Sequence, residues 1–178
     1  MINLRQMLNE DRSASADRGC LMAMLSEEDS NKILNFTKQL INENDLYIEG
    51  NEFGIETESH ATIRYGFTKD LNELQIRQLL KGQKQFLVEI KKLNTFDTNP
   101  LFDVVKFEVD SPVLRKLNEE SKKYPNEDKY PQYNPHITLC YVKKGTFPHK
   151  KEGLELYVPI KTVCYSPIQG GKSYFDLV

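Results

Sequence analysis

Two stretches in which apolar and polar residues alternate stand out in the hydrophobic pattern of this chain. The first covers 59–67 and the second covers 135–142, and both are rich in β-branched and aromatic residues. This composition and a period of two predict β-strands with one apolar and one polar face. The polar face carries the same pair in each strand: His60 with Thr62, and His136 with Thr138. Two residues along a strand span roughly 7 Å, so each histidine stands beside a hydroxyl.

The remaining pattern predicts similar elements before each of these strands. The apolar run 20–25 indicates a buried strand, and apolar residues at helical spacing indicate helices over 26–42, over 70–82 with Asp70 as its cap, and from 111 onward. Further strands are expected at 46–48, 86–90, 104–109, 154–165 and 173–178, with loops at 94–103 and 124–133. The polar run 1–18 is expected to form a loop or an arm.

Length and composition indicate one soluble domain spanning 1–178. Apolar residues make up 39% of the chain and charged residues 28%, as in ordinary globular proteins. A net charge of −2 argues against tight binding to long nucleic acids. No run approaches the ~18 apolar residues of a membrane span, and no signal-peptide core opens the chain. We therefore expect a cytoplasmic protein without membrane contacts.

Three widely spaced cysteines, Cys20, Cys140 and Cys164, lie within apolar runs. Buried thiols in a reducing compartment are the simplest interpretation. Strict alternation also places Cys140 on the face of His136, which leaves a thiol beside the histidine–threonine pair as an alternative. A cysteine nucleophile activated by His136 is disfavoured, because four strand residues separate the two by roughly 13 Å.

Two His-x-Thr strands in one small domain resemble the two-histidine (2H) phosphoesterase superfamily, which includes LigT-like RNA enzymes. The resemblance implies an α+β, bilobal fold in which two antiparallel sheets face a central cleft, with helices outside. It also implies that His60 and His136 are the catalytic histidines and that Thr62 and Thr138 bind phosphate. Imidazole has an unperturbed pKa of about 6.5, which suits one histidine as base and the other as acid near neutral pH.

This chemistry requires no metal and no cofactor. Zinc binding by His60 and His136 is also disfavoured, because the sequence offers no further ligands at suitable spacing. We therefore expect full activity in the presence of a chelator.

Three further residues are candidates for substrate contacts. Arg64 follows Thr62 by two positions, so it can meet a phosphate or form a structural ion pair. Tyr130 and Tyr133 precede the second motif and can stack on nucleobases or simply pack the loop. A basic turn beyond that motif is either a solvated surface or an attractor of anionic substrate: Lys143, Lys144, His149, Lys150 and Lys151.

Within the superfamily the chain looks most like the phage nucleases that degrade the cyclic oligonucleotide signals of CBASS defence. The expected partner is thus a cyclic di- or trinucleotide substrate, with no obligate protein partner. The first alternative is RNA processing, either on 2′,3′-cyclic phosphate ends or on 2′–5′ linkages. The second alternative is a sponge that binds cyclic nucleotides without cleaving them.

Overall fold

The computed structural model describes residues 18–49, 52–127, 132–147 and 151–178. Its helices are α2 (Glu27–Leu40), α3 (Glu73–Leu79) and α4 (Pro112–Ser121), with a 3-10 turn η1 (Glu43–Asp45) after α2. The strands are β1 (Gly19–Met24), β2 (Ile48–Glu49), β3 (Glu52–Phe53), β4 (His60–Phe67), β5 (Phe86–Phe96), β6 (Phe102–Asp110), β7 (His136–Lys143), β8 (Lys151–Ile160), β9 (Thr162–Ser166) and β10 (Ser173–Asp176). The predicted α+β class is confirmed.

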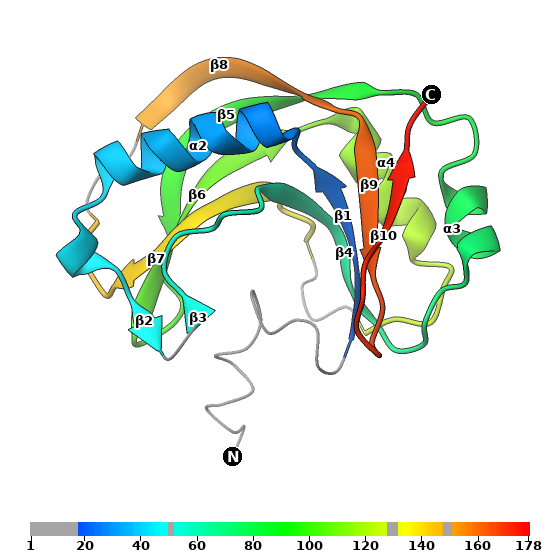
Figure 1. Ribbon diagram of the computed structural model, residues 1–178, viewed down its shortest axis with the longest axis horizontal. Helices are drawn as coiled ribbons and strands as arrows, with labels where there is room; N and C mark the ends of the chain where they lie inside the picture. The colour runs from blue at the N-terminus through cyan, green and yellow to red at the C-terminus, as the bar shows by residue number, and fades with distance from the viewer. Residues whose placement is uncertain (1–17, 50–51, 128–131, 148–150) are drawn as a thin grey trace.

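Eight strands form one curled antiparallel sheet in the order β10-β9-β1-β4-β7-β6-β5-β8 (Figure 1). The motif strands β4 and β7 are central neighbours, joined through the pair Ala61–Ile137. The sheet therefore consists of a first half, β10-β9-β1-β4, and a second half, β7-β6-β5-β8. These halves correspond to the two expected sheets, and the structure joins them edge to edge.

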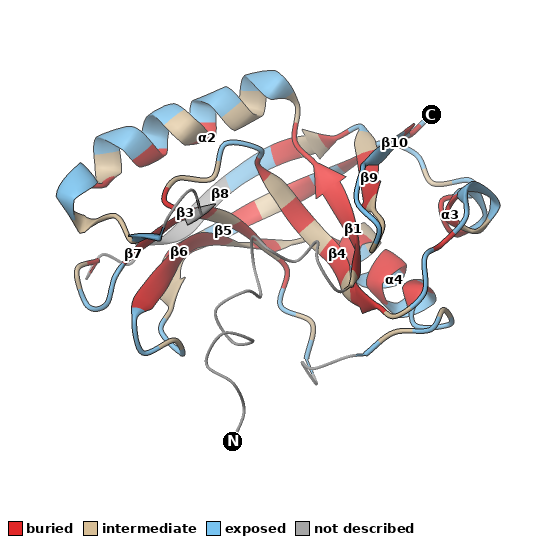
Figure 2. Cartoon of the chain, turned by 60° about the horizontal axis from the view of Figure 1, so that its bottom comes forward, coloured by how far each residue is buried: buried red, intermediate tan, exposed pale blue. Residues whose placement is uncertain are grey.

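The helices cover one face of this sheet and form the main core with it. Figure 2 shows the buried positions along the strands and the exposed outer side of α2. The helix α4 contacts β4, while α2 contacts β7 in the other half. The core includes Leu114 and Leu117 of α4 together with Ile63 and Leu139 of the motif strands. Within the described ranges, no helix has the length and apolar character needed to cross a membrane.

The opposite face of the sheet carries two smaller clusters. Sulfur-containing side chains form the first, in the first half of the sheet: Cys20, Met22, Met24 and Cys164, with Tyr65 packed against them. Aromatic side chains dominate the second, in the second half: Phe53, Phe102, Val104 and Tyr141, with Tyr47 and Phe96 packed against them. We call this face, which also carries both motifs, the motif face.

Both motif strands contain a bulge directly after the threonine. In β4, Thr62 is paired with Met22 and Arg64 with Leu21, so the residue between them has no partner in β1. In β7, the pairing with β6 skips the residue between Thr138 and Cys140 in the same way. Each bulge reverses the alternation that follows it.

The expected placement of two residues on the motif face is therefore wrong. Arg64 reaches α4 on the helix face, where Asn118 and Ser121 accept hydrogen bonds from it. Cys140 belongs to the main core. In their place, Tyr65 and Tyr141 turn to the motif face.

Several element boundaries also differ from the sequence-based expectation. The strand expected at 154–165 is divided into β8, which pairs with β5, and β9, which pairs with β1. The helix α3 begins at Glu73, capped by Asn72 in a capping box with Gln75, rather than at Asp70. The Asp70 carboxylate instead accepts a hydrogen bond from the backbone of Ile168. The strand β5 continues to Phe96, because residues 94–96 of the predicted loop stay paired with β6.

Candidate active site

The two His-x-Thr motifs lie side by side where the halves of the sheet meet. Ala61 and Ile137 are paired between β4 and β7, and both point into the core. Extending this antiparallel register by one residue places His60 across from Thr138 and Thr62 across from His136. Side chains opposite one another are about 5 Å apart, and diagonal neighbours are about 7–8 Å apart. The two histidines therefore occupy one diagonal and the two threonines the other.

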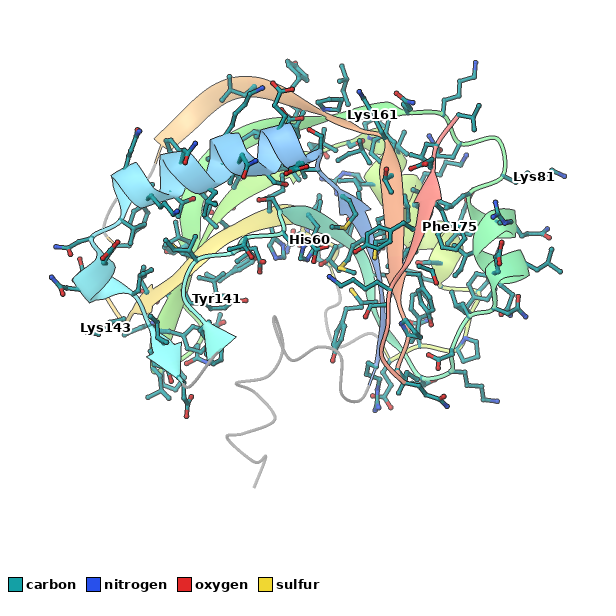
Figure 3. All side chains as sticks on the ribbon, in the orientation of Figure 1. His60, Lys81, Tyr141, Lys143, Lys161 and Phe175 are labelled. Atoms are coloured by element: carbon teal, nitrogen blue, oxygen red, sulfur yellow. The ribbon has the colours of Figure 1, made fainter. Side chains whose placement is uncertain are left out.

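Both histidines are half-buried and held in the same manner (Figure 3 labels His60, below β4). The Nδ1 of His60 lies 2.8 Å from the carbonyl oxygen of Glu58, and the Nδ1 of His136 lies 2.9 Å from that of Asn134. A carbonyl oxygen only accepts hydrogen bonds, so Nδ1 carries the proton in each contact. The neutral rings then present an unprotonated Nε2, the atom that can take or return a proton.

The cross-strand neighbours of the first motif on β1 are apolar. Met22 is paired with Thr62, and Met24 with His60. Near His60, the Glu58 carboxylate forms an ion pair with Lys172 and accepts a hydrogen bond from Tyr174.

The balance of these contacts keeps Glu58 ionised. Burial favours its neutral form, but the contacts with Lys172 and Tyr174 outweigh this effect and hold the pKa of Glu58 below its usual value. The carboxylate and the Lys172 ammonium thus offset each other beside the first motif.

The neighbours of the second motif are polar and charged. Lys106 is paired with Thr138, and Glu108 with His136. The Lys106 ammonium donates to Asn94 Oδ1 at 2.8 Å and to Glu108 Oε1 at 3.2 Å. The ring of Phe96 lies over this ammonium, 4.0 Å from Nζ to the ring centroid.

These residues were not predicted from the sequence as part of the site. The sequence feature that could have indicated them is the alternation of Lys106 and Glu108 with apolar residues along β6, which lies beside a motif strand.

The two tyrosines that precede the second motif were candidates for stacking on nucleobases. The hydroxyl of Tyr133 donates to the backbone oxygen of Thr62 at 2.8 Å, and burial raises its pKa. This contact ties the segment before β7 to the first motif, and base stacking by the Tyr133 ring stays a prediction. Tyr130 lies outside the described residues.

The basic turn is partly engaged in structural contacts. Lys143 donates to the backbone oxygen of Asn44, and Lys144 forms an ion pair with Asp103 at 2.8 Å. Lys150 and His149 lie outside the described residues, and nothing is described of the Lys151 side chain.

The expected burial of the three cysteines is confirmed. Burial raises the pKa of Cys140 to about 12 and that of Cys164 to about 11. Both thiols are therefore protonated near neutral pH, which is unsuited to nucleophilic attack. Among the described residues, no group of three or more His, Cys, Asp and Glu side chains could hold a metal ion.

Comparison with solved structures identifies the fold. Escherichia coli LigT in its apo form superposes with a TM-score of 0.61 at 15% identity, over 91% of this chain and 95% of LigT. Usb1 of Kluyveromyces marxianus superposes with a TM-score of 0.56 at 10% identity, over 92% of this chain and 99% of Usb1. TT0787 of Thermus thermophilus superposes with a TM-score of 0.53 at 16% identity, over 90% of this chain and 95% of TT0787. A comparison with curated proteins finds no match.

The curled sheet has the fold of these structures, and together with the family match that follows it defines this chain as a 2H phosphoesterase, a phosphodiesterase of the hydrolase class. A family model adds a narrower assignment. The model of the anti-CBASS protein Acb1 matches residues 21–169, and the chain belongs to that family.

Proposed function

We propose that this protein cleaves the 3′–5′ phosphodiester bonds of cyclic di- or trinucleotide immune signals. Of His60 and His136, one acts as the acid and the other as the base. The observation that carries the proposal is the matched pair of histidines, each held through Nδ1 so that Nε2 is available. Membership of the anti-CBASS Acb1 family favours a cyclic signal nucleotide as the substrate.

The reaction needs only groups from the substrate and these side chains. One neutral histidine takes the proton of a ribose 2′-hydroxyl, whose oxygen attacks the adjacent phosphorus. The protonated second histidine gives its proton to the departing 5′-oxygen as the bond from phosphorus to that oxygen breaks. Thr62 and Thr138 donate hydrogen bonds to the non-bridging oxygens, which gain charge in the transition state.

The first product is a linear nucleotide with a 2′,3′-cyclic phosphate. Water can open this ring by the same chemistry with the two histidine roles exchanged, since the first step leaves the former acid neutral and the former base protonated.

Opening RNA ends that carry a 2′,3′-cyclic phosphate is a second candidate function. It is favoured by the likeness to E. coli LigT, which has been crystallised with 3′-AMP. That reaction would use the same four motif residues on a different nucleotide.

The decisive experiment incubates the purified protein in EDTA with a panel of cyclic di- and trinucleotides and with RNA ending in a 2′,3′-cyclic phosphate. His60→Ala and His136→Ala test the site. Lys81→Ala, on an exposed turn distant from His60, serves as the control (Figure 3).

We expect linear products from the cyclic substrates, lost in both histidine variants and kept in the control. Cleavage of RNA ends alone would favour the second candidate. Tight binding without cleavage would identify a sponge, and dependence on an added divalent metal would contradict the mechanism.

A further inference from the structure

A buried lysine lies on the motif face beside the second catalytic motif. The side chain of Lys106 is only 3% exposed, and burial lowers its pKa, although Glu108 opposes this effect. Its Nζ contacts the Asn94 and Glu108 oxygens and the face of the Phe96 ring, which are favourable partners for an ammonium group. The contact with Phe96 places the ring against the buried cation.

The same aromatic ring also contacts a catalytic histidine. The centroids of Phe96 and His136 lie 4.9 Å apart, with the ring planes at 89°. Such an edge-to-face contact restricts the orientation of the imidazole. Phe96 thus contacts both the buried ammonium and the imidazole ring.

The equivalent cross-strand positions in the first half of the sheet carry no charges. Lys106 faces Thr138 as Met22 faces Thr62, and Glu108 faces His136 as Met24 faces His60. Methionine side chains fill the first pair of positions. A buried lysine carries a desolvation penalty that a methionine avoids, so its presence beside the second motif calls for a role beyond packing.

We propose that Lys106, Glu108, Asn94 and Phe96 form a positioning network for His136, which fixes the imidazole ring and balances its charge. In this network Glu108 favours the protonated ring, and Lys106 opposes it. Asn94 keeps the two charges together, because it accepts from Lys106 and donates to Glu108 at 2.6 Å.

Other charged or titratable groups also lie near His136. They are Lys92, paired with Glu108 on β5; His60 on β4; and Glu56, whose backbone binds Leu139 beside the second motif. Substitutions at Lys106 and Glu108 remove none of these groups.

The test is an NMR titration of the His136 ring in the full-length protein, with its signal assigned by its loss in His136→Asn. Lys106→Met should raise the His136 pKa by about 0.5–1 unit, and Glu108→Gln should lower it by a similar amount. The controls are Lys91→Met and Glu89→Gln, a charge pair on β5 at 3.3 Å. We expect these two to move the His136 pKa by less than about 0.2 unit.

Shifts of equal sign in Lys106→Met and Glu108→Gln, or no shift in either, would overturn the proposal. Glu108→Gln keeps a hydrogen-bonding side chain, so it stays informative if Lys106→Met fails to fold.

The catalytic consequence of the network rests on the proposed function, but the titration does not. If the protein cleaves a cyclic nucleotide, one limb of the pH profile of kcat/KM should move with the His136 pKa in each variant. Opposite titration shifts without any turnover would leave the network intact and reject only the proposed reaction.

Discussion

Ala61 of β4 is paired with Ile137 of β7, and neither side chain is exposed to solvent. Each of these residues is the central position of a His-x-Thr motif. The pair thus sets the relative placement of the four motif side chains from the buried side of the sheet. Changes at this pair test whether packing beneath the motifs supports the site.

Ile137→Ala should lower the free energy of unfolding by about 2–5 kcal/mol, because it leaves a cavity beneath the site. Urea titration followed by circular dichroism measures this change. Leu87→Ala is the control, since Leu87 is 59% exposed on β5. A loss of less than about 1 kcal/mol would mean that the core closes around the smaller side chain.

Thr62→Val and Thr138→Val remove one hydroxyl each and keep the shape of the side chain. If these hydroxyls stabilise charge in the transition state, kcat should fall by about 10²–10³-fold in each variant. Thr→Ser at either position should retain most of the activity. The measurement is steady-state kinetics on the substrate found in the panel, with exposed Thr57→Val as the control. Unchanged kcat in both valine variants would remove the threonines from the mechanism.

The pair Glu58–Lys172 should make stability depend on pH in the acid range. The folded pKa of Glu58 is depressed, so its contribution is complete above the unfolded pKa of about 4.3 and is lost as the pH falls through the folded value. Lys172→Met should remove this contribution, with an effect below about 1 kcal/mol because both groups are partly exposed.

Thermal melts between pH 7 and pH 3 measure this effect as a smaller acid-induced drop in Tm for the variant. Lys116→Met, which breaks an exposed pair with Glu120, is the control. Parallel profiles for Lys172→Met and the wild type would show that the pair contributes nothing.

Arg64→Met tests the revised placement of this residue. Its guanidinium donates to Asn118 and Ser121 on α4, so the change leaves buried polar groups without their partner. We expect a loss of about 2–3 kcal/mol in stability and an unchanged KM. Urea titration and kinetics together distinguish the two roles. A raised KM with unaltered stability would favour the phosphate contact instead. The control is Arg77→Met, which breaks an exposed ion pair with Glu73.

Gly66→Ala should also destabilise the protein. Gly66 has a φ of +107°, and an added Cβ would lie 2.4 Å from the backbone oxygen of Glu127. Both strain and overlap oppose the substitution, so we expect a loss of about 1–3 kcal/mol. Gly82→Ala is the matched control, because its φ is also positive but its Cβ would meet nothing. Equal losses at both sites would show that the backbone conformation alone decides the cost.

The sequence contained enough information for the motif strands and their neighbours. Apolar and polar residues alternate around His60 and His136, and this alternation predicts both strands. It also predicts that the two histidines lie on the less buried face. The bulges could not be predicted, because the inserted residues Ile63 and Leu139 are apolar and suit a buried position in either register. A single extra residue then moved Arg64 to the opposite face.

The Lys106 network was missed for a different reason. Its members come from two strands, and their contact with His136 depends on pairing between strands that are distant in sequence. Single-strand periodicity indicates which face a residue occupies, but not which residue lies beside it. Lys106 on its own would be expected at the surface, and only the surrounding partners explain its burial.

The placement of the helices on the two motif strands has a consequence for how the molecule unfolds. The helix α2 follows β1 of the first half but lies on β7, and α4 follows β6 of the second half but lies on β4. If either half separated, a motif strand of the other half would therefore lose the helix that covers it. Hydrogen exchange at the amides of Ala61 and Ile137 should therefore slow or quicken together under any change of solvent. Opening of either half would therefore uncover both motif strands, and the candidate active site would be lost in a single event.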